Sequence, residues 1–144
     1  MLGVNRCKLP LRIPVRTDSL FRRPSANGIH GMHSKMLEQL QAMEAVSGAA
    51  FVRELLDLFL SECEVRFGRI EAALPGGDLA GAQRHFHLVQ GSAASMGATH
   101  LRRISALGEE ACRQGDHELA VRSYRLSTKA LGQLKPFISN WRPG

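Results

Sequence analysis

The 144-residue chain has few cysteines, and their number and spacing argue against a disulfide framework. Cys7, Cys63 and Cys112 are odd in number and far apart, so they form neither paired disulfides nor a Cys-x-x-Cys metal motif. Long apolar runs are also missing, because the run LLDLFL at 55–60 is interrupted by Asp57 and is far shorter than the roughly 20 residues of a membrane helix. These absences predict a soluble protein in a reducing compartment, with no membrane partner.

The sequence also lacks strand patterns and a strongly basic folded region. No alternation of apolar and polar residues is long enough to indicate a strand. The formal net charge is +6, but residues 1–34 contain six basic residues against Asp18 alone, which leaves 13 basic and 12 acidic residues in 35–144. Aromatic residues are not interleaved with basic ones there, as base stacking would require. We therefore expect an all-α protein whose folded part binds no nucleic acid.

Residues 1–34 are predicted to be a disordered basic arm. The segment contains Pro10, Pro14 and Pro24, several glycines and no sustained hydrophobic period. Its basic, acid-poor composition loosely resembles an organelle transit peptide. The alternative is a poorly ordered leader, since Met32 and Met36 could serve as later starts. If this arm bound nucleic acid, deleting it would abolish a salt-dependent affinity.

Residues 35–142 are predicted to form one domain, an up-and-down four-helix bundle with one or two short helices added at its N-terminal side. Asp78 is placed to cap a helix that follows the break at 75–77, and Pro136 should kink or shorten the last helix. A complete bundle needs no second subunit, so a monomer is expected. The helical stripes span 36–43, 52–74, 79–96, 101–111 and 117–141.

The helix predicted at 79–96 places His87 on its outer side. At about 100° per residue, His87 lies roughly 140° from the centre of the apolar stripe, together with Arg84, Gly91, Ala94 and Ser95. A glycine inside a helix costs on the order of 1 kcal/mol relative to alanine. Gly91 therefore indicates a flat surface on which another protein can approach the imidazole.

A solvent-exposed imidazole is partly neutral at physiological pH, and its nitrogen can attack phosphorus. The nearest acidic residues in the sequence, Asp78 and Glu109, are more than one helical turn away, so no activating carboxylate is expected. His87 thus resembles an acceptor whose partner supplies the catalytic groups, including Mg²⁺. His85 points roughly 200° away from His87 and cannot share a metal ion with it, so no metal site or cofactor is expected.

This segment has two other interpretations. A lone surface histidine is usually a solvated side chain. The small residues GSAAS could simply allow a neighbouring helix to pack closely, which suits Ala93 and Ser92. That explanation fails for Gly91, which the helical wheel places opposite the core.

The stretch HLVQGSAASMGA at 87–98 resembles the signature of histidine-containing phosphotransfer proteins, usually written H-x-[LF]-K-G-S-[SA]-x-x-x-G-A, and it is most similar to the plant-type members. The resemblance implies that His87 accepts a phosphoryl group, that Gly91 is the position of close approach and that Ser92 supports the site. It extends over 36–138 and includes FVRELLDLFLSECEVRFGRIEAAL, Cys112 and SYRLSTKALGQL.

This resemblance implies a relay without kinase activity of its own. The phosphoryl group would come from the receiver-domain aspartate of a hybrid sensor kinase and pass to the receiver of a response regulator, with Mg²⁺ bound by the receiver. Plant-type members act in hormone relays such as cytokinin signalling, in the cytoplasm and the nucleus. An alternative is a decoy that binds receivers and competes with true relays without relaying phosphate efficiently.

The chain departs from the family pattern at Gln90, where the signature has lysine. Gln90 can still donate hydrogen bonds, but a charge-assisted bond is about twice as strong as a neutral one. We therefore predict slower transfer with docking retained, partly compensated by Arg84. Docking is predicted to involve apolar and small residues beside His87 and exposed parts of the second helix, with two further arginines steering the encounter. These docking residues are Leu88, Ala94, Ser95, Arg102 and Arg103.

Overall fold

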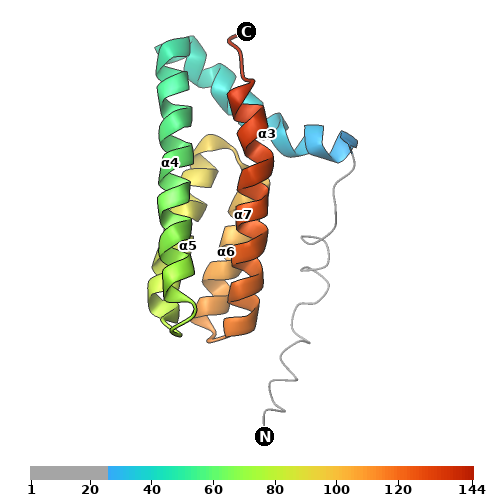
Figure 1. The fold of residues 1–144 in the computed structure, drawn as a ribbon. Coiled ribbons are helices and arrows are strands. Elements are labelled where there is room, and N and C mark those ends of the chain that lie inside the picture. The colour runs from blue at the N-terminus through green and yellow to red at the C-terminus, as the bar shows by residue number, and fades with distance from the viewer. Residues whose placement is uncertain (1–25) are drawn as a thin grey trace, which may run out of the picture.

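The computed structural model describes the backbone from Ala26 and the side chains from His33 to the end of the chain, and every regular element in that part is a helix (Figure 1). The prediction of an all-α bundle is confirmed. The prediction of disorder for residues 1–25 lies outside the described residues. The helices are α3 (Ala26–Ser47), α4 (Ala49–Ala73), α5 (Leu79–Met96), α6 (Thr99–Arg113) and α7 (His117–Ser139).

The helices α4 to α7 form the bundle, and α3 crosses one end of it (Figure 1). Their short connections are where the sequence predicts them. Asp78 caps α5 by accepting a hydrogen bond from the Gly81 amide at 2.9 Å, and Asp116 accepts one from the Leu119 amide at 3.1 Å. Gly97 ends α5 with a positive φ of 76°, a conformation that suits glycine.

The first described helix differs from the prediction. The predicted arm extends to residue 34, but α3 already begins at Ala26. His33 is buried and stacks on Phe137 with ring centroids 4.6 Å apart, and Met36 is fully buried. Contacts with the bundle stabilise this helix, although its first residues show no hydrophobic period of their own.

Pro136 does not end the last helix at the preceding residue. The helix α7 continues past Pro136 to Ser139, two residues short of the predicted end. The proline lies on the exposed side, where water can replace the lost hydrogen bond. Leu134 and Ile138 on the opposite side are buried and hold the last turns against the bundle.

The predicted apolar stripes form the core. The stripe of α5 contributes Phe86, which is fully buried, and Trp141 follows α7 into the core. Arg53 of α4 lies over the Trp141 ring at 5.5 Å and donates hydrogen bonds to the Ile138 and Trp141 carbonyls. Among the predicted core positions, Leu55, Leu79, Leu107 and Tyr124 are only half-buried.

The helices α5 and α6 approach closely at Gly108. A Cβ at this position would lie 2.6 Å from Phe86 Cζ, a distance that real contacts do not allow. The missing side chain lets the Phe86 ring lie directly against the α6 backbone. This contact fixes the position of the next residue, Glu109, relative to α5.

No helix in the described part of the chain is long and apolar enough to cross a bilayer. The two described cysteines, Cys63 and Cys112, are buried and unpaired.

Candidate functional site

His87 projects into solvent from the outer side of α5, as predicted. Its side chain is 67% exposed. Gly91, Ala94 and Ser95 are also exposed, and a Cβ added at Gly91 would meet no atom within 4 Å. The surface beside the imidazole is therefore low and open, which leaves room for a partner.

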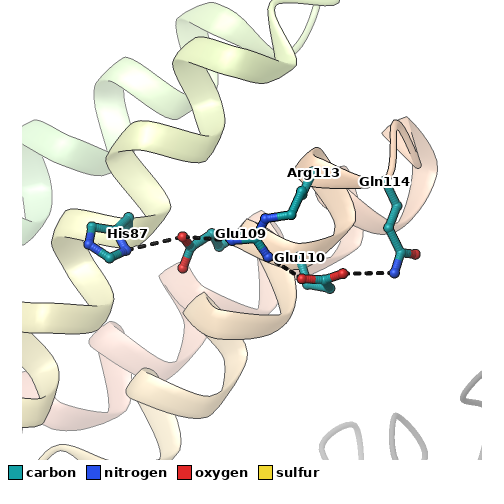
Figure 2. Close-up of polar contacts among 5 residues, drawn as sticks. All are labelled: His87, Glu109, Glu110, Arg113 and Gln114. Atoms are coloured by element: carbon teal, nitrogen blue, oxygen red, sulfur yellow. Dashed lines mark hydrogen bonds and ion pairs between the residues drawn. The ribbon is translucent and has the colours of Figure 1, made fainter.

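A carboxylate lies next to the imidazole, contrary to the prediction. Glu109 Oε2 is 3.1 Å from His87 Nδ1 (Figure 2). The sequence of one helix shows only the neighbours within about one turn of His87. The antiparallel return of α6 along α5 brings Glu109 across from a position 22 residues later in the chain.

Glu109 is held in place by a network along α6. Its side chain is only 13% exposed, and its Oε2 also lies 3.2 Å from Arg113 Nη2. Arg113 in turn pairs with Glu110, which accepts a hydrogen bond from Gln114 Nε2 at 2.8 Å (Figure 2). Because α6 residues hold the carboxylate from the other side, it presents a fixed acceptor to the imidazole.

This arrangement selects one tautomer of His87. A carboxylate only accepts hydrogen bonds, so the proton of the neutral ring belongs on Nδ1, as an N–H donor to Glu109. The lone pair is then on Nε2, on the far side of the ring from Glu109 (Figure 2). A histidine held in this way has a nucleophilic nitrogen directed away from its supporting helix.

An open hollow of about 430 Å³ adjoins the imidazole and is lined by Ala80, Gln83, Arg84, His87 and Glu109. Arg84 is exposed and supplies positive charge at this hollow. Gln83 was not predicted as a site residue; its position one turn before His87 was a usable signal.

Gln90 is half-buried, and its Oε1 atom is buried without a hydrogen-bond partner. On the helical wheel it lies between the core and His87, on the side of α5 that faces α6. Its predicted role as a support for phosphate stays a prediction.

The other predicted residues differ in their distance from the imidazole. Leu88 is exposed and Ser92 is half-buried beside it on α5. Arg102 is half-buried and shares the face of α6 that bears Glu109, but seven residues separate them, or about 10 Å along the axis. Arg103 is exposed and turned about 120° from that face. Neither arginine lines the hollow at His87.

His85 lies on the other side of α5, toward α4. Burial lowers its pKa, and the charges of Arg66, Arg84 and Arg69 lower it further, in that order. The two histidines therefore face different neighbouring helices. Within residues 33–144, no three histidine, cysteine or acidic side chains are grouped so that they could hold a metal ion.

A helical bundle with an exposed histidine above a run of small residues defines the histidine phosphotransfer class. The Hpt domain family matches residues 54–136, more than half of the chain, and the chain belongs to this family. No curated protein gives a match to it.

Two solved structures share the fold. The histidine-containing phosphotransfer protein ZmHP2 from maize is 19% identical, with a TM-score of 0.71 over 86% of this chain and 90% of the maize chain. The histidine-containing phosphotransfer protein B from Pseudomonas aeruginosa PAO1 is 24% identical, with a TM-score of 0.66 over 73% of this chain and 94% of the bacterial chain. Both likenesses concern the fold.

Proposed function

We propose that this protein is a phosphorelay intermediate that accepts a phosphoryl group on His87 and passes it on. Nε2 attacks phosphorus of an aspartyl phosphate, and the aspartate carboxylate leaves with the electron pair of the P–O bond. The second transfer is the reverse, with a carboxylate of another receiver attacking and Nε2 leaving. The observation that supports this best is the exposed His87 ring whose Nδ1 faces Glu109 beside bare Gly91.

The proposed partners are receiver domains of hybrid sensor kinases and of response regulators. A receiver presents an acidic face with Mg²⁺, so Arg84 beside His87 would attract it, and Arg102 and Arg103 would steer it from farther away. Exposed Leu88 and Ala94 offer apolar contact next to the imidazole. Mg²⁺ held by the receiver would supply charge neutralisation during transfer, and Arg84 at the hollow would add positive charge from this chain.

Within this proposal, the plant-type assignment includes a hormone relay of the cytokinin type and a location in cytoplasm and nucleus. Its support is the run of small residues that ends in Gly97 and Ala98, where Gly97 terminates α5. The bacterial and the maize structures share the fold alike and do not distinguish this subtype.

The test is phosphotransfer to the purified full-length chain from a receiver-bearing kinase supplied with radiolabelled ATP. We expect a label on the protein that acid removes and base leaves intact, because a P–N bond to histidine has that stability and an acyl phosphate is labile to both. Absence of label with an active kinase would contradict the proposal.

Replacing Glu109 with alanine is expected to slow transfer by roughly tenfold to a hundredfold, less than the about 10⁴-fold loss caused by disrupting a buried catalytic triad carboxylate. The substitution removes the acceptor for the Nδ1 proton, so both tautomers become populated. Initial rates of label transfer, measured at saturating phosphorylated receiver, check this.

Two variants separate the causes. Glu109→Gln keeps a carbonyl acceptor without the charge and should retain more activity than Glu109→Ala. Glu118→Ala removes an exposed carboxylate in the first turn of α7, outside this network, and should transfer at the original rate. Equal rates for all three variants would exclude a positioning role for Glu109.

Replacing Gln90 with lysine is expected to speed transfer a few-fold, because a charged donor binds the phosphoryl oxygens more strongly than a neutral amide. The measurement compares transfer rates and receiver affinities of the two proteins. An unchanged rate would remove the argument that the missing lysine limits this chain.

The decoy function is the second candidate, and the partly buried Gln90 in place of the lysine favours it. A decoy would bind receivers and inhibit transfer to another phosphotransfer protein while remaining unlabelled. The labelling experiment distinguishes the two functions directly.

A further inference from the structure

The outer face of α4 bears an apolar stripe that is open to solvent. Phe51, Leu58 and Val65 are 45%, 58% and 51% exposed. They are seven residues apart, so they stay on one side of the helix, with a drift of only about 20° at each step. Single exposed apolar residues are ordinary, but three in this register form the pattern of a helix–helix contact. In Figure 1, α4 lies along one edge of the bundle.

Charged residues near the stripe are arranged so that two copies related by a two-fold axis would bring opposite charges to the same height. Glu54 and Arg69 are exposed near its two ends, at equal distances from the midpoint between residues 61 and 62. Leu58 and Val65 are symmetric about the same midpoint. A second α4 in antiparallel orientation therefore brings Leu58 level with Val65, and Glu54 level with Arg69 of the other copy. A parallel pairing would put Glu54 against Glu54, which is repulsive.

The sizes of the side chains fit the same register. Phe51 comes level with Ala72, and the half-buried Leu55 comes level with Gly68. Ala72 is exposed, and a Cβ at Gly68 would meet no atom within 4 Å, so both positions leave room for a larger group from another chain. The large Phe51 ring thus lies at the height of a small residue of the other copy, which leaves room for it.

We propose that the α4 stripe is a self-association face on which two copies of this chain pair antiparallel through Leu58 and Val65, with Glu54 of each copy against Arg69 of the other. One helix face is small compared with the roughly 1,200–2,000 Å² of a typical specific interface, so the dimer is weak and reversible. This differs from the monomer predicted from the completeness of the bundle. The stripe lies outside the bundle core, on exposed parts of the second helix that are also predicted to contribute to receiver docking, so a second copy would compete for them.

Self-association would also affect the site, a consequence that depends on the proposed relay function. The helices α4 and α5 are antiparallel and joined at 74–78, so Val65, nine residues before Leu74, lies at the same height as His87, nine residues after Asp78. A second copy on α4 would then compete with a receiver for access to the surface around His87. Dimerisation would slow phosphotransfer at high protein concentration.

The test is sedimentation velocity of the full-length chain from low to high micromolar concentration. We expect the average mass to rise toward that of a dimer, and Leu58→Glu to weaken association by roughly tenfold or more. Val46→Glu is the matched control, because Val46 is 87% exposed but lies on α3, outside the stripe. A monomer at every concentration, or no change with Leu58→Glu, would overturn the proposal.

Charge reversal at exposed positions tests the antiparallel register of the two α4 helices without changing any buried residue. Glu54→Arg and Arg69→Glu should each weaken the dimer, and the double variant should restore it, because the ion pairs are reversed. Failure of the double variant to restore association would refute the antiparallel pairing. If the wild-type chain is monomeric and Leu58→Glu reduces only receiver binding, the stripe is a receiver contact and the self-association proposal is wrong. None of these measurements uses phosphotransfer, so they test self-association independently of the proposed relay function.

Discussion

Replacing His87 with glutamine is expected to abolish phosphoryl acceptance, with label reduced below detection. A carboxamide nitrogen is not nucleophilic, because its lone pair is delocalised into the carbonyl group. Among the described residues, no other side chain takes the position of His87 opposite Glu109. Glutamine retains similar size and can still donate a hydrogen bond to Glu109 Oε2, so α5 and α6 should keep their contact. The measurement is the acid-labile label on the full-length chain after incubation with a phosphorylated receiver.

His85→Gln is the matched control for this loss, since His85 is two residues away on the same helix and faces α4. That variant should accept phosphate at a rate close to the original. Receiver binding by His87→Gln, measured without phosphorylation, should persist because the docking residues are intact. If His87→Gln were labelled as efficiently as the wild type, the assignment of the acceptor would be wrong.

Replacing Gly108 with alanine is expected to destabilise the bundle and to disturb the site together. The new methyl group would meet the ring of fully buried Phe86, and overpacking of this kind typically costs about 1–3 kcal/mol. That exceeds the roughly 1 kcal/mol by which alanine favours a helix over glycine. The free energy of unfolding from urea denaturation should therefore fall, and separation of α5 from α6 should lengthen the contact between His87 and Glu109.

The matched substitution at Gly132 is expected to change the free energy of unfolding in the opposite direction. Gly132 is also inside a helix, but it is exposed and a Cβ there would meet no atom within 4 Å. Gly132→Ala should raise the free energy of unfolding by up to about 1 kcal/mol. A stabilising effect of Gly108→Ala would show that the Phe86 ring can move aside at little cost.

Local sequence patterns predicted most of the fold. The stripes of α4 to α7 and the cap at Asp78 follow from helical period and from hydrogen-bonding chemistry within a few residues. The start of α3 could not be predicted in the same way, because His33 is held by Phe137, more than a hundred residues later. The continuation of α7 through Pro136 likewise depends on core contacts made by neighbouring turns.

The candidate site was predicted in part, for a related reason. Exposure of His87 and the open surface at Gly91 are properties of one helix and could be derived from a helical wheel. Glu109 belongs to a different helix, and its contact with His87 depends on the register between α5 and α6. That register is set by the close approach of Gly108 to Phe86, which a single sequence does not display as a pattern.

The contact between Gly108 and Phe86 also connects the reactive imidazole, through Glu109, to the buried core. Glu109 follows directly after the glycine, so its carboxylate keeps its place for as long as the two helices remain packed. The imidazole of His87 thus needs no reorganisation before it accepts the phosphoryl group. Any conformational adjustment during transfer takes place in the receiver domain. Turnover would then be limited by how often that domain arrives in the right orientation, and it should depend on solvent viscosity and ionic strength.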